Sequence, residues 1–456
     1  MKRQILGILG LLLTAAPLPA VTQPQKPPAA QSEAAAENDS DPSETLRHLG
    51  AVQIQSRQYD AAIETFRKII ALDEKDFGAE DPQIAGDLLF LSGLLQAINR
   101  FPEAEALLRR MLAIDEKGLG PDHPDVAIAL SSLFHLLRTT GRFAEAEPLI
   151  RRALAIDEKH FGPDDVHVAA DLIELTQMLQ ASNRLTEAEP LIRRALAINE
   201  KKLGPDDPAV AVAANELGQL LQATSRFTEA EPLMRRALAI DEKALGPEHR
   251  DVARDLNNLS LLFYATNRAG EAEPLMRRAL AVNEKSLGPD NPRVAACLNN
   301  LAAMLQARMQ LDEAEPLIRR ALAIEEKVFG PDHTNVAIDL SNLATLLQQK
   351  LRFTEAEPLF RRALAIEEKS LGPDHPDVAI GLGSLAGLLA ATNRVAEAEP
   401  MMRRALTLLL DLARNTGYER PELATVLQSY RTLLQQMGRT DTEIEAAIDA
   451  LVGKRI

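Results

Sequence analysis

Residues 120–161 decide the fold of this 456-residue chain, and their sequence is GPDHPDVAIALSSLFHLLRTTGRFAEAEPLIRRALAIDEKHF. Gly120 suits the left-handed position that ends a helix, and Pro121 cannot continue one. Pro124 suits the first position of the next helix. Apolar residues then recur at helical spacing, namely Leu130, Leu133, Leu136 and Leu137. The pattern predicts a helix over 124 to about 139.

A second helix is predicted from about 144 to 159, after a turn at Gly141-Arg142. Pro148 falls in its first turn, where a missing N–H group costs little. At 1.5 Å per residue this helix is about 24 Å long. It carries one apolar face, formed by Ala146, Leu149, Ile150, Ala153 and Ile156. Neither helix can bury its apolar face alone, so neighbouring pairs must stack.

The same pattern recurs every 42 residues. Gly-Pro occurs at Gly120, Gly162, Gly204, Gly246, Gly288, Gly330 and Gly372, and Gly78 lies one period earlier with Ala79 in place of Pro. Glu-Ala-Glu keeps the same register around Ala104, Ala146, Ala188, Ala230, Ala272, Ala314, Ala356 and Ala398. This periodicity excludes three separate globular domains and predicts one elongated array.

The residues resemble the tetratricopeptide repeat more closely than HEAT or armadillo repeats, which a 42-residue period would also fit. The resemblance is carried by a small residue in the first helix (Gly218), the Gly141-Arg142 turn, and Ala146 and Ala153 in the second helix. The longer motifs RFTEAEPL and LGPDHPDVA are similar to the kinesin light chain type of that family. The resemblance implies an all-α, right-handed superhelical α-solenoid, and the pattern gives about ten antiparallel helix pairs.

The chain is expected to have four parts. Residues 1–20 have the layout of a secretory signal peptide, with a positive start, an apolar run and a small-residue end, and cleavage is expected after Ala20. An uncleaved anchor is the alternative. Residues 21–42 are rich in Pro and Ala, which predicts a disordered linker. Residues 43–414 form the repeat array, and 415–456 form a divergent C-terminal capping helix pair.

Composition excludes several functions. The formal net charge of −15 argues against binding to nucleic acid or an anionic membrane surface. A single cysteine excludes an internal disulfide framework and a cysteine-rich metal site. No nucleophile, phosphate-binding or zinc motif occurs, so we expect no enzyme and no cofactor.

Two recurring sets of polar residues suggest sites but have simpler explanations. The Arg doublets, from Arg109-Arg110 to Arg403-Arg404, are expected to form surface ion pairs such as Glu147–Arg151 and Glu189–Arg193 rather than a ligand stripe. The slot before each first helix contains His, Asp or Asn, and we expect helix capping there rather than a metal site. Its members are His123, Asp165, Asp207, His249, Asn291, His333 and His375.

Every second repeat has an aspartate beside the apolar side of its first helix. Asp171, Asp255 and Asp339 are separated by repeats that have Ala213 and Cys297 at the same position. We hypothesise that each Asp pairs with an Arg of a neighbouring helix. A partly hydrated carboxylate is the open alternative.

The candidate binding site lies on the other face of the first helices. Amides recur there, and they offer donors and acceptors to an extended peptide backbone. The resemblance implies that this face lines a concave groove that holds peptides; the alternatives are that the amides hydrate the face or link adjacent repeats. The predicted groove residues are Asn215, Gln222, Asn257, Asn258, Tyr264, Asn299, Asn300, Gln306, Asn342 and Gln348.

The sequence thus predicts an exported, periplasmic or secreted scaffold that binds a protein or peptide partner in this groove and does not span a membrane after signal cleavage. The alternative is a structural or assembly subunit of a cell-envelope complex. Kinesin light chains bind cargo peptides with acidic residues, but this acidic, amide-rich array has no basic equivalent, so that specificity is not transferred. The partner's identity and the oligomeric state are not predicted.

Overall fold

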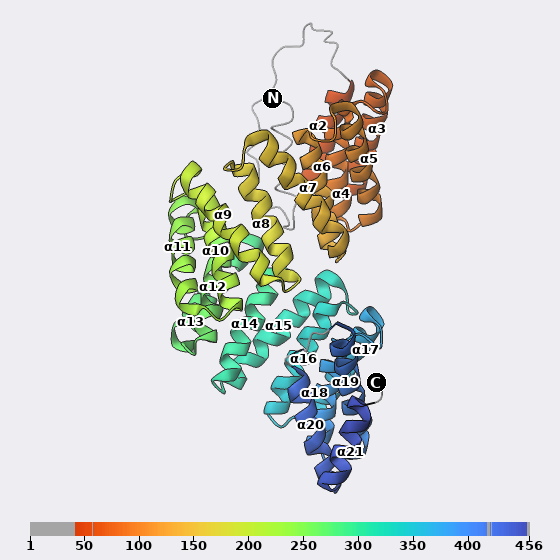
Figure 1. The fold of residues 1–456 in the computed structure, drawn as a ribbon, viewed down its shortest axis with the longest axis vertical. Helices are drawn as coiled ribbons and strands as arrows, with labels where there is room; N and C mark the ends of the chain where they lie inside the picture. The colour runs from red at the N-terminus through yellow and green to blue at the C-terminus, as the bar shows by residue number, and fades with distance from the viewer. Residues whose placement is uncertain (1–41, 57, 417–419, 421, 454–456) are drawn as a thin grey trace, which may run out of the picture. The chain divides into compact units, whose positions relative to one another are not determined.

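The computed structural model describes residues 42–56, 58–416, 420 and 422–453, and within this part the chain is all-α, with no β-strand (Figure 1). The predicted signal peptide, and the linker up to residue 41, lie outside the described residues. None of the helices in the described ranges is long and apolar enough to cross a bilayer.

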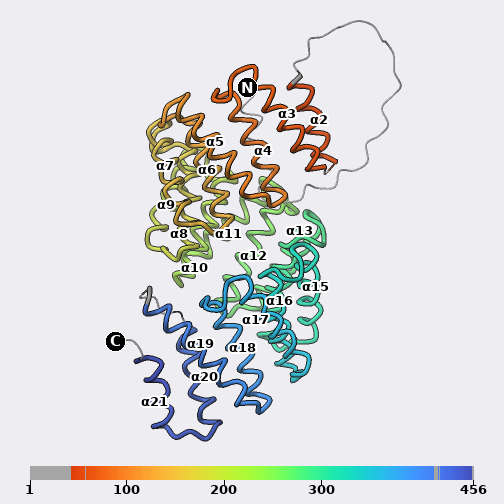
Figure 2. Tube along the Cα trace, turned by 90° about the vertical axis from the view of Figure 1, so that its right-hand side faces the viewer, coloured from red at the N-terminus to blue at the C-terminus, as the bar shows by residue number. Residues whose placement is uncertain are grey.

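In the described part of the chain, the helices alternate as the first and second members of ten antiparallel pairs (Figure 2). The first helices are α2 (Pro42–Gln55), α4 (Ala85–Ala97), α6 (Pro124–Thr139), α8 (Val166–Ala181), α10 (Pro208–Ala223), α12 (Arg250–Ala265), α14 (Pro292–Ala307), α16 (Thr334–Gln349), α18 (Val378–Ala391) and α20 (Glu422–Gln436). The second helices are α3 (Tyr59–Phe77), α5 (Phe101–Leu119), α7 (Phe143–Phe161), α9 (Leu185–Leu203), α11 (Phe227–Leu245), α13 (Ala269–Leu287), α15 (Leu311–Phe329), α17 (Phe353–Leu371), α19 (Val395–Thr416) and α21 (Asp441–Val452). A short 3-10 helix, η1 (Pro82–Ile84), precedes α4. The predicted number of pairs is confirmed.

The described residues fall into two compact units, of which unit 1 ends at Asn258 and unit 2 begins at Leu259, and the boundary lies within α12. Within each unit, first helices pack against the second helix of their own pair and against that of the preceding pair, as α10 does with α11 and α9 in unit 1 and α16 with α17 and α15 in unit 2. Neighbouring first helices also contact each other, as α8 does with α10 and α16 with α18.

The helix boundaries follow from the proline, glycine and capping residues at the ends of each helix. Helix α6 spans the predicted residues, whereas α7 begins one residue earlier and ends two residues later than predicted. Gly162 ends α7 with φ 91° and ψ 157°, a conformation in which a side chain would be strained. The slot before the first helix is confirmed as an N-cap, because Asp207 Oδ1 accepts from the N–H of Ala209 at 2.8 Å. Histidine caps in the same way, since His123 Nδ1 accepts from the N–H of Asp125 at 3.2 Å.

The core lies between the two helices of each pair and between successive pairs. Leu133, Leu136 and Ala146 are at most 1% exposed. The small residue expected in the first helix permits close packing, because a Cβ at Gly218 would lie 2.7 Å from Met234 Cγ. Stacking therefore buries the apolar faces that an isolated pair would expose.

The two ends of the helix array differ. On α2, Leu49 is 47% and Val52 is 57% exposed, whereas Leu91, which occupies the position of Leu49 one repeat later, is 2% exposed. No preceding pair covers α2 within the described residues. At the other end, α21 turns Ile444 and Ile448 inward and its acidic residues outward.

The turn between the two helices of a pair places one residue at positive φ. Asparagine, which tolerates it well, fills this position in four repeats, at Asn99, Asn183, Asn267 and Asn393. Met309 and Leu351 fill it in two consecutive repeats, with φ values of 61° and 59°. Bulky side chains are disfavoured in this conformation, so these two turns are locally strained.

Candidate functional site

The predicted groove residues lie on four consecutive first helices. Asn215 and Gln222 belong to α10, and Asn257, Asn258 and Tyr264 to α12. The remaining five belong to α14 and α16 of unit 2, and they are Asn299, Asn300, Gln306, Asn342 and Gln348. They recur at three register positions of the helix, which we call the amide positions.

In unit 1 the amides bond to one another. Asn258 Nδ2 donates to Asn215 Oδ1 at 3.3 Å, and Asn257 Nδ2 donates to Asn258 Oδ1 at 3.1 Å. Asn215 is only 1% exposed, so the prediction that it faces an open surface is wrong. The physical reason is the lateral contact between α10 and α12, which places the amide of one helix against the next.

A longer polar network, which was not predicted from the sequence, lies beside these amides. Arg138 Nη1 donates to Gln177 Oε1 at 2.9 Å, and Gln177 Nε2 donates to Glu216 Oε1, also at 2.9 Å. His135 Nε2 lies 2.9 Å from Glu174 Oε1. These contacts link α6 to α8, and α8 to α10. Burial raises the pKa of the Glu216 carboxyl, against the opposing effect of the Gln177 hydrogen bond.

The signal that could have revealed this network is a spacing of 39 residues rather than 42. Both Arg138–Gln177 and Gln177–Glu216 are separated by 39 positions. This spacing is the repeat period less about one helical turn. Polar residues at that offset in adjacent repeats lie side by side on neighbouring first helices.

In unit 2 Asn299 and Asn300 are engaged, and the other three predicted amides have no hydrogen-bond partner among the described residues. Asn299 Nδ2 donates to Asp339 Oδ1 at 2.5 Å, which links α14 to α16. Within the described residues, no hydrogen bond is made by the side chains of Gln306, Asn342 or Gln348. The amide nitrogen of Gln306 is buried, whereas Asn342 and Gln348 are half-buried and available to bond with a ligand.

The alternating Asp positions form part of a buried carboxyl slot between successive pairs. Asp255 on α12 shares Arg254 with Asp241 on α11, and the distances from Arg254 Nη2 are 2.9 and 3.0 Å. The predicted arginine of a neighbouring helix is wrong for Asp255, because its partner is the preceding residue of the same helix. It is also wrong for Asp171 and Asp339, which form no ion pair with arginine in the part of the chain that the structure describes.

The carboxyl groups of this slot have raised pKa values with or without an arginine, and burial raises the pKa of Asp255 to about 7 even beside Arg254. Burial, with the nearby carboxylates of Asp157 and Glu174, raises the pKa of Asp171 to about 8. Burial also raises the pKa of Asp339 to about 7, although its hydrogen bond from Asn299 opposes the shift. These groups hold protons near neutral pH because burial disfavours their charged forms.

The second helices carry a lattice of ion pairs. Arg184 Nη1 lies 2.6 Å from Glu147 of the preceding second helix, and Arg184 Nη2 lies 2.6 Å from Glu187. The predicted pairs Glu147–Arg151 and Glu189–Arg193 are confirmed, each at 2.7 Å. The first arginine of these doublets, Arg151 or Arg193, therefore forms an ion pair with a glutamate of its own helix.

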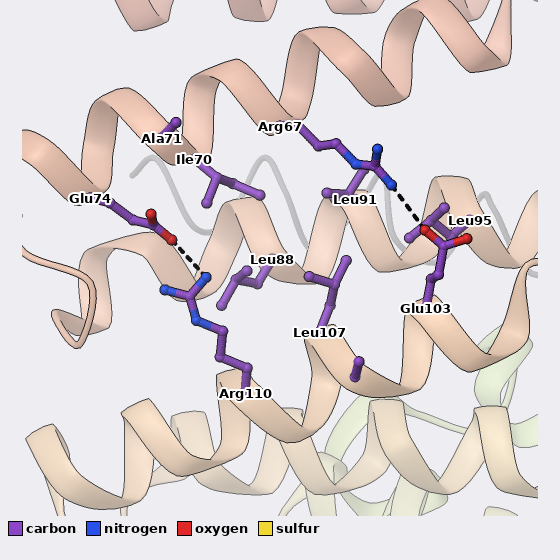
Figure 3. A pocket seen from close by; sticks show the side chains of 11 residues that line it. Arg67, Ile70, Ala71, Glu74, Leu88, Leu91, Leu95, Glu103, Leu107 and Arg110 are labelled. Atoms are coloured by element: carbon purple, nitrogen blue, oxygen red, sulfur yellow. Dashed lines mark hydrogen bonds and ion pairs between the residues drawn. The ribbon is translucent and has the colours of Figure 1, made fainter.

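A hollow of about 380 Å³ lies between α3 and α5, above α4 (Figure 3). Leu88, Leu91 and Leu95 line it, and ion pairs cross it at Arg67–Glu103 (2.9 Å) and Arg110–Glu74 (2.6 Å). The three leucines are at most 2% exposed, so a ligand could not reach this floor without separating the helices.

No cluster of three or more His, Cys, Asp and Glu side chains that could hold a metal ion occurs in the described ranges. The loop histidines act as helix caps instead, as His333 does by accepting from the N–H of Asn335 at 3.2 Å.

Comparisons with known proteins agree with the repeat architecture. The sequence model described as "Tetratricopeptide repeat" matches residues 41–117, 88–159, 125–201, 169–243, 209–285, 293–366 and 340–411. No curated protein sequence matches the chain.

Three solved structures illustrate the likeness. Kinesin light chain TPR-like repeats from Podosopora anserina are 26% identical with a TM-score of 0.40, covering 44% of this chain and 95% of that one. BtubC (BKLC) from P. vanneervenii is 24% identical with a TM-score of 0.43, covering 52% and 92%. Aspartyl phosphate phosphatase F from Bacillus subtilis is 13% identical with a TM-score of 0.47, covering 83% and 96%. These TM-scores are all below 0.5, so the likenesses carry no argument about activity.

Proposed function

Since the chain belongs to the tetratricopeptide repeat family, we propose that it is a non-enzymatic scaffold that binds a protein or peptide through its first helices. The fold of this family generally serves protein–protein interaction. The observation that supports the assignment here is a difference in side-chain pairing between the first helices and the second helices. The second helices pair their charges along the array, whereas Asn342 and Gln348 leave half-buried amides unpaired on the first helices.

The groove assignment is tested by site-specific photo-crosslinking of the whole chain in cells. Replacement of Ile338, an exposed residue on α16, by benzoylphenylalanine is expected to yield a discrete crosslinked protein. The same residue at Ala323, on the exposed face of α15, is the matched control and is expected to yield none. Crosslinks from Ala323 alone would place binding on the second helices and overturn the groove proposal.

We also propose that the protein is exported to the periplasm or secreted, which the pattern of residues 1–20 supports. Sequencing the amino terminus of the mature protein is expected to find Val21 first. An intact Met1 contradicts cleavage.

One observation favours the alternative of a structural or assembly subunit. Leu49 and Val52 expose apolar surface at the end of α2, where other repeats bury the same positions. Light scattering of the purified protein separates the two functions. A stable, concentration-independent complex that Leu49→Lys and Val52→Lys disrupt supports assembly, whereas a monomer supports the scaffold.

A further inference from the structure

Three neighbouring first helices of unit 2, α14, α16 and α18, share a surface with almost no charge. From Val294 onward α14 has no charged residue, α18 has none, and α16 has only Asp339, which is 2% exposed. Successive first helices contact each other in this region, α14 with α16 and α16 with α18. We call the exposed side of these three helices the uncharged face.

This face contrasts with the corresponding helices of unit 1. There, Arg138, Glu174 and Glu216 lie among the amides and bond across α6, α8 and α10. The contrast also holds for the chain as a whole, in which 26% of residues are charged. The absence of exposed charge from α16, α18 and the part of α14 after Arg293 therefore makes this a distinct surface.

The uncharged face combines exposed apolar side chains with unpaired amides. Ile338 on α16 is 56% exposed and Ile380 on α18 is 47% exposed, at the same register position of consecutive repeats. Asn342 lies one helical turn from Ile338 on α16. An extended peptide could place apolar side chains against the isoleucines while its backbone bonds with the amides.

Two glycines on one side of α18 leave the helix backbone there uncovered by side chains. A Cβ at Gly383 or Gly387 would meet no atom within 4 Å. These glycines lie one turn apart, on the side of α18 that the core leucines do not occupy. Glycine in a helix interior costs stability, and it permits a ligand to approach the backbone closely.

We propose that the uncharged face binds an extended peptide segment without charged side chains. This inference rests on the proposed scaffold function and specifies its partner. A charged side chain entering the face would lose hydration and find no ion partner there. Acidic segments are further disfavoured by the net charge of −15. Helices about 8–10 Å apart give a path that about six extended residues can cross.

The test uses fluorescence anisotropy with capped peptides of about ten residues and the purified chain from Val21 onward. One peptide pool contains only Ala, Ser, Thr, Val, Ile, Leu, Asn and Gln. Two matched pools carry Asp or Lys at two central positions. The uncharged pool is expected to bind at least about tenfold more tightly than either charged pool. Tighter binding of a charged pool, or no binding of the uncharged pool at millimolar protein, overturns the inference.

Variants locate the binding and keep the fold intact. Gly383→Leu with Gly387→Leu fills the open side of α18 and is expected to weaken binding at least about tenfold. Because both sites are open helix positions, the melting temperature should not fall. Gly270→Leu is the matched control, since a Cβ there on α13 also meets nothing within 4 Å. Unchanged binding by the α18 variant overturns the inference.

A second pair of variants distinguishes this inference from the broader function. Ile338→Ser with Ile380→Ser is expected to weaken binding, whereas Ile128→Ser, at the same register position on α6 and 49% exposed, is not. Loss of binding only in Ile128→Ser would leave the scaffold function standing on unit 1 and refute the uncharged face. If no first-helix variant changes binding while crosslinks arise from α15, both proposals fail.

Discussion

The guanidinium of Arg254 lies 2.9 Å from the carboxylate of Asp255, the residue that follows it on α12, and also binds Asp241 of the preceding helix. The equivalent slot that contains Asp157 and Asp171 has no arginine. The same buried position thus contacts an arginine in one interface and lacks one in another, and burial raises the carboxyl pKa in both, to about 7 for Asp255 and about 8 for Asp171.

The arginine-free slots predict that stability falls as pH rises through neutrality. Burial raises the pKa of Asp171 to about 8 in the folded state, whereas an unfolded Asp titrates near 3.9. The folded chain thus binds the proton more tightly, and its stabilising effect is full below about pH 4 and lost as pH rises toward 8. Asp339 acts in the same direction.

This pH dependence can be measured by urea unfolding between about pH 5 and pH 8.5. The slope contributed by one proton approaches 1.4 kcal/mol per pH unit, to order of magnitude. Asp171→Asn should flatten the profile and be more stable than the parent above pH 8. A profile identical to that of the parent would show that Asp171 does not titrate in this range.

Asp255→Ala is expected to lower stability by about 1–3 kcal/mol, because it leaves Arg254 partly buried with one fewer carboxylate. The melting temperature at pH 7 gives the readout. A double-mutant cycle with Arg254→Ala is the control, and the double variant should lose less than the sum of the two single changes. Strict additivity would mean that the contact contributes no coupling.

The uncovered end of α2 predicts unequal effects of one substitution at equivalent positions. Leu91→Ala should cost about 2–5 kcal/mol, because Leu91 is 2% exposed and its removal leaves a cavity. Leu49→Ala should change stability by no more than about 0.5 kcal/mol, since Leu49 is 47% exposed. Denaturant unfolding of the two variants makes the comparison. Equal costs would show that another segment covers Leu49 in solution.

The strained turn at Leu351 predicts a stabilising substitution. Leu351 is 73% exposed with φ 59°, so Leu351→Asn loses no core packing and relieves the conformational strain. We expect a gain of about 0.5–1 kcal/mol in the free energy of unfolding. The reverse change, Asn393→Leu, should destabilise by a similar amount. Destabilisation by Leu351→Asn would indicate that Leu351 makes a contact that its exposure does not reveal.

Much of the architecture was predictable because each repeat contains the residues that begin and end its own helices. Pro124 begins α6, Gly162 ends α7, and the leucines between them set which face is buried. These are local backbone preferences, and repetition makes them unambiguous. The candidate site was less predictable, since Asn215 and Asn342 occupy similar repeats yet differ in their surroundings.

The sequence by itself therefore determined the helix pairs, their caps and their core, because these depend on residues within one repeat and its neighbour. Only the tertiary structure decided which polar side chains form hydrogen bonds or ion pairs with neighbouring helices. Whether Gln177 bonds to Glu216 or Asp171 meets an arginine depends on how neighbouring helices are offset. A shift of one helical turn changes which side chains meet, and the 42-residue period does not specify that offset.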